Sequence, residues 1–492
     1  MATINEQLHF VLIPFMAQGH TIPMVDIAKL LAHRGIKVTL LLTPMNLMRL
    51  KPVLVRANEL GLLIYVKEIF FPSEEVGLPA GCENFDALPS TSLAPTFFSA
   101  VGLLEAQVET LVKQMHPKPC CIIADICFAF ASELALKIGI PRILFHGMCC
   151  FSRLCVHQIL SSRILDDLAD ESNWFDVPGM PEKVSFRASQ VRGMISRDNK
   201  DWKKFQDKLA EAENLAYGVV FNTFDDLESR FIDQYVKVKE KKVWSIGPVS
   251  MCNKEYMDKV NRGNITTNDI KECLKWLESQ EHGSVIYACL GSICNLTSAQ
   301  MLEIGLGLEA SQRPFIWVIR TGGGSNYSKD LKEMMEQNGF EERLKKTSRG
   351  FVIWGWAPQV LILSNPGIGG FLTHCGWNSS LEGIASGLPM LTWPLFGDQF
   401  YNEKLLVDVL GIGVRIGVQK MIEFGKEEEM GVQVSRERVK ESVDELMDDG
   451  EEGQERRKRA EELAEKAKKA VEGGSSHVNI GKLIEEVRNF RA

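Results

Sequence analysis

A glycine-rich strand that runs into a helix carries the residues best suited to bind an anion. The predicted strand 367–373 is followed directly by His374, and Asn378 and Ser379 lie where the helix begins. The first turn of a helix presents unpaired backbone N–H groups and the positive end of the helix dipole. Gly376 allows the backbone to approach a ligand closely. Because these side chains add further donors, the segment is suited to a diphosphate.

The same stretch offers groups that match the parts of a nucleoside and of a sugar. Glu382, one turn into the helix, could accept hydrogen bonds from the paired hydroxyls of a ribose. Trp356 offers a flat face on which a base could stack. Asp398 and Gln399 follow a strand and a proline-containing loop, from which they could bind sugar hydroxyls.

A histidine and an aspartate at strand ends form a candidate catalytic pair. His20 lies where the first strand ends and the first helix begins, and Asp125 ends the strand 120–124. An imidazole with a pKa near ~6.5 can remove a proton at neutral pH. A carboxylate at the same sheet edge could orient it, as in a catalytic triad. The residues alone leave open that His20 only caps the helix.

The apolar pattern predicts the elements that position these residues. Short, wholly apolar segments alternate with segments of helical periodicity, which indicates parallel sheets covered by helices on both faces. The predicted strands are 8–13, 37–43, 120–124 and 142–145 in the first half, and 284–289, 315–319, 351–353 and 368–373 in the second. The predicted helices include 21–32, 97–115, 131–138, 298–310 and 378–386.

A polar stretch without periodicity separates the two series and predicts the domain organisation. Residues 248–269 are expected to form an interdomain linker between a domain of residues 1–247 and a domain of residues 270–474. A last helix, 475–492, is expected to pack back onto the first domain. The predicted fold class is α/β, with two Rossmann-like doubly wound domains facing each other across a cleft. Such a cleft suits a reaction with two substrates.

Composition and charge exclude several classes of function. The chain has 492 residues and a net charge of −8, which argues against nucleic acid as a partner. No secretory signal is visible, and no apolar run reaches the ~18 residues of a membrane helix, so we expect no integral membrane segment. The twelve cysteines include no CxxC pair and no zinc-ligand spacing, which indicates reduced thiols. We therefore expect a cytoplasmic protein, and a monomer.

A close resemblance to a known family is carried by the segment 356–399, which reads WAPQVLILSNPGIGGFLTHCGWNSSLEGIASGLPMLTWPLFGDQ. In order, length and chemistry it resembles the signature box of plant secondary-product glycosyltransferases. The resemblance extends over nearly the whole chain and implies an inverting, UDP-dependent transferase of family 1 with the two-domain GT-B fold. One departure is Asn365, which stands where many members have His, outside the presumed donor contacts.

The resemblance implies a role for each matching residue. In the first domain, which would bind the acceptor, His20 would be the general base and Asp125 would orient it. Ala357 would complete the donor site, and the Gly291-Ser292 turn would add a phosphate contact. The other implied donor residues are Trp356 and Gln359 at the uracil, Glu382 at the ribose, His374, Asn378 and Ser379 at the phosphates, and Trp377, Asp398 and Gln399 at the sugar.

The resemblance also implies the substrates. In the family, Gln at the end of the box is associated with glucose, so UDP-glucose is the expected donor substrate, with no cofactor and no metal. The stretches 289–296 (CLGSICNL) and 311–320 (SQRPFIWVIR) resemble a clade that acts on small alcohols. A triterpenoid or steroid is the first expectation for the acceptor, and a flavonoid or other phenolic the second. Candidates for an apolar acceptor pocket, each of which could equally be core, are Phe15, Met16, Phe128, Phe145, His146 and Phe151.

Rival interpretations differ in what they require of the chain. An enzyme that extends a sugar chain on an already glycosylated acceptor would show the same motifs. A non-catalytic UDP-sugar-binding protein would not need both His20 and Asp125. A hydrolase using that pair would need a GxSxG elbow, which is absent. The acidic pair Asp166-Asp167 resembles the metal sites of another transferase fold, but it lies in a charged, helical stretch, so no metal site is predicted.

Overall fold

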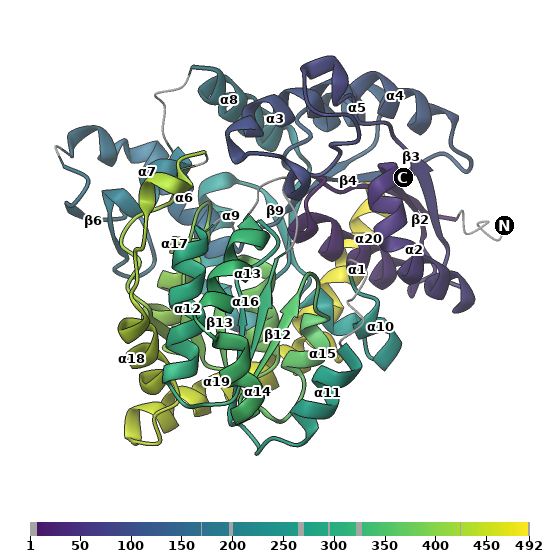
Figure 1. Ribbon diagram of the computed structural model, residues 1–492. Helices are drawn as coiled ribbons and strands as arrows, with labels where there is room; N and C mark the ends of the chain where they lie inside the picture. Colours follow the sequence, from purple (N-terminus) through teal and green to yellow (C-terminus); the bar gives the residue numbers. More distant parts are fainter. Residues whose placement is uncertain are drawn as a thin grey trace.

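The computed structural model describes residues 7–168, 170–195, 200–263, 270–293, 296–320, 327–423 and 425–490. They form two α/β domains, each a parallel sheet with helices on both faces (Figure 1). The predicted α/β class with two doubly wound parallel sheets is confirmed. None of the helices described is long and apolar enough to cross a membrane.

The N-terminal sheet has the strand order β3-β2-β1-β4-β5-β8-β9, and all its neighbouring strands are parallel. Its strands are β1 (His9–Ile13), β2 (Lys37–Leu42), β3 (Ile64–Glu68), β4 (Cys121–Asp125), β5 (Arg142–His146), β8 (Gly218–Phe221) and β9 (Lys242–Ser245). A separate antiparallel hairpin consists of β6 (Trp174–Asp176) and β7 (Ser185–Arg187). The helices are α1 (Gln18–Ala32), α2 (Pro44–Glu59), α3 (Ala94–Leu103), α4 (Glu105–Gln114), α5 (Phe130–Ile138), α6 (Cys150–Ser162), α7 (Ala188–Ile195), α8 (Lys200–Leu215) and α9 (Asp225–Lys239).

The C-terminal sheet has the order β12-β11-β10-β13-β14-β15, again all parallel. Its strands are β10 (Val285–Cys289), β11 (Phe315–Ile319), β12 (Gly350–Trp354), β13 (Ile368–Thr373), β14 (Met390–Thr392) and β15 (Gly413–Arg415). The helices from the linker onward are α10 (Tyr256–Val260), α11 (Ile270–Glu278), α12 (Ser298–Ala310), α13 (Tyr327–Gln337), α14 (Phe340–Thr347), α15 (Gln359–Leu363), α16 (Trp377–Ala385), α17 (Gln399–Lys404), α18 (Arg436–Leu446), α19 (Glu451–Val471) and α20 (Ser475–Phe490).

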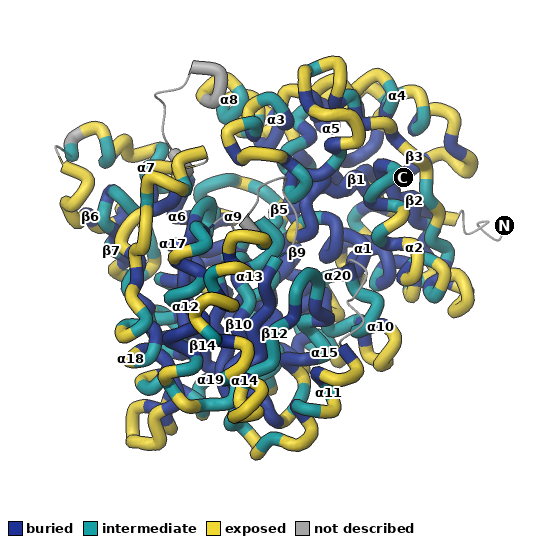
Figure 2. Tube along the Cα trace, viewed as in Figure 1, coloured by how far each residue is buried: buried dark blue, intermediate teal, exposed yellow. Residues whose placement is uncertain are grey.

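The alternation of side chains along the central strands explains why both sheet faces are covered. On β1, Val11 and Ile13 belong to the core formed with α3, α4 and α5, whereas Phe10 and Leu12 belong to the core formed with α1, α2 and α20. A strand buried on both faces is expected to be largely apolar, and the polar residues of β1, β4 and β5 lie at the strand ends, as His9, Asp125, Arg142 and His146 do. Figure 2 shows the central strands of the sheets dark blue and the outer turns of the helices yellow, whereas the edge strands β3 and β12 are less buried.

Three features differ from the expected elements. The predicted helix 97–115 is two helices, α3 and α4, separated at Leu104 soon after Gly102, a residue that disfavours helix. The expected linker contains α10, and its residues 264–269 lie outside the described residues. This segment is bound to α1, because Asn253 donates to Asp26 (2.8 Å) and accepts from Lys29 (2.7 Å).

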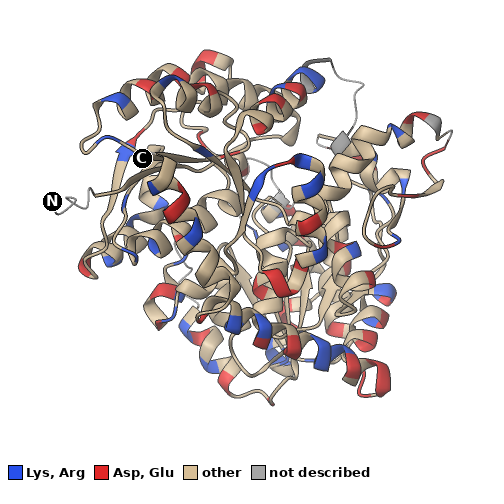
Figure 3. Cartoon of the chain, turned by 180° about the vertical axis from the view of Figure 1, so that it is seen from behind, with Lys and Arg blue, Asp and Glu red and all other residues tan. Residues whose placement is uncertain are grey.

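The last helix, α20, returns to the N-terminal domain and packs beside β9 and α1 (Figure 1). Leu483 and Val487 are fully buried there. Tyr217 of the N-terminal domain donates a hydrogen bond to Glu486 (2.8 Å). On the face shown in Figure 3, acidic and basic residues are interspersed over the helices.

Candidate active site

The strand orders bring His20 and Asp125 together. In both sheets the order reverses at the centre, between β1 and β4 and between β10 and β13, and ligands of such sheets bind at that reversal. His20 lies just after β1, in the first turn of α1, and Asp125 is the last residue of β4. The imidazole Nδ1 lies 2.6 Å from the Asp125 carboxylate Oδ2. Two residues far apart in the sequence therefore form the pair that was predicted.

Asp125 is held from several directions. The residue is fully buried, and its second carboxylate oxygen accepts from the backbone N–H of Cys127 (3.1 Å). Arg142 donates to its backbone carbonyl (3.1 Å). Since a carboxylate can only accept, Nδ1 of His20 carries the proton and Nε2 is the atom able to take one. The His20 side chain keeps 28% of its surface exposed, so the ring is not closed off from a substrate.

The two groups shift each other's pKa in opposite directions. Burial alone would lower the pKa of His20, but the charge of Asp125 and the hydrogen bond to it, with a smaller contribution from Asp398, raise that pKa above the ordinary 6.5. Burial alone would raise the pKa of Asp125, but the interaction with His20 lowers it. Asp125 therefore stays ionised, and His20 holds its proton to a higher pH than an ordinary imidazole.

His374 has the opposite character. It follows β13, and its ring lies against the Gly291-Ser292 turn that follows β10. A side chain at Gly291 or at Gly376 would overlap the imidazole, so both positions require glycine. Burial lowers the pKa of His374 to about 4, and its Nδ1 has no hydrogen-bond partner. At neutral pH the ring is therefore uncharged and can donate one hydrogen bond.

The beginning of α16 faces the beginning of α1 across the domain boundary. No side chain caps the first turn of α16. Asn378 donates from its amide to the backbone carbonyl of Gly19, the residue before His20, and accepts from Asn222 (3.2 Å). Among the described residues no side chain caps α1 either, so two helix starts without a side-chain cap meet next to His20.

Trp377 joins the domains through its side chain. The indole is almost fully buried, and its N–H donates to the backbone carbonyl of Asn222 (2.7 Å). This polar atom is therefore already used within the protein. The contact with a sugar that the motif implies for Trp377 would fall to its backbone N–H.

The end of the motif is organised by two amides. The Gln399 carbonyl oxygen accepts from the backbone N–H groups of Leu395 (2.7 Å) and Phe396 (3.1 Å), which leaves its NH₂ group as the part able to meet a ligand. Asn402 donates to Asp398 (2.8 Å). Burial raises the pKa of Asp398 to about 6. Asn402 lies beyond the motif, so sequence reasoning missed it.

The residues assigned to the nucleoside form a second polar group. Gln359 donates to Ser379 (3.0 Å) and to Glu382 (2.8 Å). Glu382 also accepts from Arg262, which the sequence placed in a featureless linker and which no pattern marked. Trp356 has a buried indole N–H without a partner, and Ala357 lies buried beside it in sequence.

The six acceptor-pocket candidates separate into two groups. Phe15 lies edge-on to the His20 ring at a centroid distance of 5.4 Å, and Met16 and Phe128 belong to the same apolar cluster. All six are buried, with at most 3% of their surface exposed, but Phe145 and Phe151 belong to other core clusters and His146 stacks on Phe221. Burial and the charge of Arg153 lower the pKa of His146 to about 4. An alternation of apolar residues does not distinguish a pocket wall from a core, because both are apolar.

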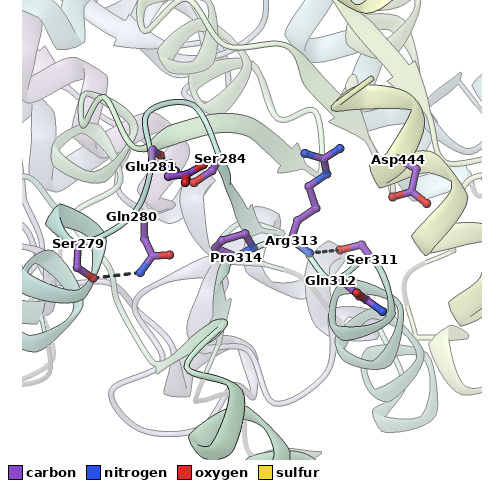
Figure 4. A pocket seen from close by; sticks show the side chains of 9 residues that line it. All are labelled: Ser279, Gln280, Glu281, Ser284, Ser311, Gln312, Arg313, Pro314 and Asp444. Carbon is purple, nitrogen blue, oxygen red and sulfur yellow. Dashed lines mark hydrogen bonds between the residues drawn. The ribbon is translucent and has the colours of Figure 1, made fainter. Parts of the chain in front are cut away.

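Other candidate sites lie elsewhere. Asp166 is exposed, and among the residues described no three His, Cys, Asp or Glu side chains gather as metal ligands. Figure 4 shows an open hollow lined by residues such as Glu281, Ser284 and Arg313. These precede β10 and β11 and so lie at the amino edge of the sheet, opposite the edge that carries His374.

The opposite pKa shifts of His20 and His374 predict that the two histidines titrate in different pH ranges. In the wild type, His20 should titrate above pH 6.5 and His374 near pH 4. In Asp125→Asn the titration of His20 should move to lower pH, because burial would then act without the opposing charge. That of His374 should stay where it is. NMR of labelled imidazoles against pH measures both, and an unchanged His20 titration in Asp125→Asn would contradict the assignment.

Comparisons with known proteins show which family the chain resembles over nearly its whole length. A family model described as UDP-glucoronosyl and UDP-glucosyl transferase matches residues 241–447, and one described as glycosyltransferase, N-terminal domain, matches residues 6–251. UDP-glycosyltransferase 73C11 of Barbarea vulgaris is 52% identical over 482 residues, which are 98% of this chain and 96% of that protein. UDP-glycosyltransferase 73C1 of Arabidopsis thaliana is 53% identical over 482 residues, 98% and 97% of the two chains.

Solved structures share the arrangement of both domains. Glycyrrhiza uralensis UGT73P12, in complex with glycyrrhetinic acid 3-O-monoglucuronide, has a TM-score of 0.89 at 34% identity and covers 99% of this chain and 96% of its own. Medicago truncatula UGT71G1, in complex with UDP-glucose, has a TM-score of 0.80 at 25% identity, with 99% and 100% covered. The fold is thus GT-B, and the chain belongs to the plant family 1 UDP-glycosyltransferases.

Proposed function

We propose that this enzyme transfers glucose from UDP-glucose to a hydroxyl of a small lipophilic acceptor. A triterpenoid or steroid is the first candidate for the acceptor, and a flavonoid or other phenolic is the second. The observation that carries the proposal is the His20–Asp125 hydrogen bond of 2.6 Å beside the start of α16. The bond from Asn378 to Gly19 holds these two parts together. A base next to an anion site is what a direct displacement on a nucleotide-sugar needs.

His20 has the properties of the general base. Its Nε2 takes the proton of the acceptor hydroxyl while the oxygen attacks the anomeric carbon from the face opposite UDP, so the configuration inverts. Asp125, ionised and hydrogen-bonded to Nδ1, stabilises the imidazolium that forms. The same pairing explains why the pKa of His20 is raised, since the carboxylate favours the charged ring.

The leaving diphosphate is stabilised by hydrogen-bond donors. Charge develops on its oxygens as the glycosidic bond breaks in an oxocarbenium-like transition state. The uncapped start of α16 offers backbone N–H groups, and neutral His374 offers a ring N–H. Trp356 would stack on uracil, and Glu382, oriented by Gln359, would accept from the ribose hydroxyls.

The surroundings of His20 support a lipophilic acceptor. Phe15, whose edge contacts His20, stacks on Phe98 at 5.4 Å, and Phe98 in turn contacts Phe205 at 4.8 Å. Phe98 and Phe205 are only partly buried. An apolar wall with few polar groups favours a large, flat, lipophilic molecule.

A second candidate is the extension of a sugar chain on an acceptor that is already glycosylated. It is favoured by one observation, the ligand of the UGT73P12 structure, which is a 3-O-monoglucuronide. Product analysis with matched pairs of free and glycosylated acceptors decides between the two candidates. Faster transfer to the sugar of the glycosylated acceptor would favour the second.

Replacement of the base tests the mechanism. His20→Ala should lower the rate of transfer by ~10²–10⁴-fold, because the acceptor hydroxyl loses its proton acceptor. UDP affinity, measured by calorimetry, should survive. Asp125→Ala should lose less activity, since the base remains but is poorly oriented.

A control for this experiment lies at the other end of α1. His33 is exposed there, and His33→Ala should behave as the wild type. If His20→Ala kept more than about a tenth of the wild-type rate, the general-base assignment would be wrong.

The choice of sugar should follow from Gln399 and Asp398. The Gln399 NH₂ donates and the Asp398 carboxylate accepts, so an axial hydroxyl would leave one of them unpaired at a cost of about 1–3 kcal/mol. In competition, UDP-glucose should therefore be used in preference to UDP-galactose, whose 4-hydroxyl is axial. It should also be preferred to UDP-glucuronic acid, whose carboxylate Asp398 would repel, and to UDP-xylose, which lacks the C6 hydroxyl. Preference for another donor would contradict the proposal.

A matched variant isolates the donated hydrogen bond. Gln399→Glu keeps an oxygen for the N–H groups of Leu395 and Phe396 but replaces the NH₂ donor by an acceptor. We expect kcat/KM for UDP-glucose to fall while thermal stability is kept. An unchanged kcat/KM would show that Gln399 supports only the loop.

We also propose that no divalent cation takes part in the chemical step. The α16 start and His374 already offer donors to the diphosphate. Turnover should therefore persist in excess chelator and should not depend on added Mg²⁺ or Mn²⁺. Complete loss of turnover in chelator, with recovery on adding either ion, would contradict this expectation.

A further inference from the structure

Arg262 lies between the two domains, and two nitrogens of its guanidinium group donate hydrogen bonds, one to each domain. Its Nε donates to Asp26 of α1 (2.9 Å), and its Nη1 donates to Glu382 of α16. The side chains of all three residues are at most 10% exposed. Burial alone would lower the pKa of Arg262, but the two carboxylates raise it. A buried cation between two buried carboxylates is costly to break, because removal of one partner leaves a charge without compensation.

The segment that carries Arg262 belongs to the N-terminal domain. Asn253 is bonded to Asp26 and Lys29, and Arg56 of α2 donates to Asp258 of α10 (2.6 Å). Residues 252–263, called the linker segment below, are therefore fixed to α1 and α2. Through Arg262, this segment reaches a carboxylate of the other domain.

Two consecutive residues of the linker segment touch the nucleoside end of the donor site. Arg262 contacts Glu382, and the backbone of Gly263 lies against the Trp356 ring. A side chain at Gly263 would come within 2.5 Å of that ring, and its φ of +99° also favours glycine. The residues expected to hold ribose and uracil are thus both in contact with the linker segment.

Glu382 has a fixed orientation as a result. One of its oxygens accepts from Arg262 and the other accepts from Gln359 (2.8 Å). Each carboxylate oxygen has two lone pairs, so each keeps one for a further donor. A carboxylate held at both oxygens can receive two ribose hydroxyls without first losing side-chain entropy.

We infer that Arg262 is a positioning residue for the donor nucleotide, which orients Glu382 toward the ribose hydroxyls and links nucleotide binding to the contact between the domains. This inference rests on the proposed role of Glu382 at the ribose. The contact is the same in ground and transition states, so its loss should raise KM for UDP-glucose and leave kcat largely unchanged.

Calorimetry on the full-length protein tests the inference with two probes, UDP and 2′,3′-dideoxy-UDP. Arg262→Met removes the charge but keeps the length of the side chain, and it should weaken UDP binding by about tenfold or more. It should change the affinity for 2′,3′-dideoxy-UDP little, because this nucleotide lacks the two ribose hydroxyls that Glu382 would bind. Equal losses for both nucleotides, or no loss for UDP, would overturn the inference.

Arg56→Met is the matched control. It also removes an arginine that fixes the linker segment, but Arg56 does not contact Glu382, so UDP affinity should stay near the wild-type value. If Arg56→Met reproduced the loss, loosening of the segment would explain the effect and the inference would be wrong. A thermal unfolding curve identifies a variant that fails to fold, and Arg262→Lys, which keeps the charge, then serves for the same two-probe comparison.

Two measurements on the wild-type protein distinguish a failure of this inference from a failure of the proposed function. Equal affinity for the two nucleotides would overturn the ribose role of Glu382, and the inference with it. Transfer from UDP-glucose, measured independently, decides the proposed function.

Discussion

The hydrogen bond from Asn378 to the Gly19 carbonyl is the interaction on which the rest of the site depends. Each domain folds around its own sheet, and neither sheet determines how far its strand reversal lies from that of the other. The distance between base and donor site is instead set where α1 and α16 meet, to which this bond, the Trp377–Asn222 bond of 2.7 Å and the Arg262 bridge from Asp26 to Glu382 all contribute. A group-transfer site shared by two domains needs such direct contacts, because small displacements of reacting groups are costly in rate.

Two histidines beside the strand reversals of the two sheets are given different chemistry by their neighbours. Both follow a central strand, at the reversal of strand order. His20 has a buried carboxylate beside it and binds protons more strongly, whereas burial dominates the pKa of His374 and keeps it neutral. Environments that push the pKa values of like groups apart commonly separate a base from a neutral hydrogen-bond donor.

Much of the fold and of the catalytic pair could be predicted because both depend on local patterns. Apolar strands, helix starts and residues at strand ends are visible in the sequence, and parallel sheets place strand ends at one edge. Arg262 could not be predicted, since its role comes from contacts with Asp26 and Glu382, which are distant in the sequence. Asn402 lies outside the motif, and its NH₂ group also donates to the backbone carbonyl of Cys375, a contact that no local pattern indicates. The burial of Phe145 and Phe151 could not be predicted either, because an apolar residue gives the same signal in a core and in a pocket.

The return of α20 to the N-terminal domain has a mechanical consequence. The chain passes between the domains twice, once through the linker and once between α19 and α20, and its second passage ends in a helix packed beside β9. Two bodies joined at one point can turn about any axis, but two bodies joined at two points turn only about the line through both. The second crossing thus narrows the set of relative domain motions that could separate the donor half of the site from the base.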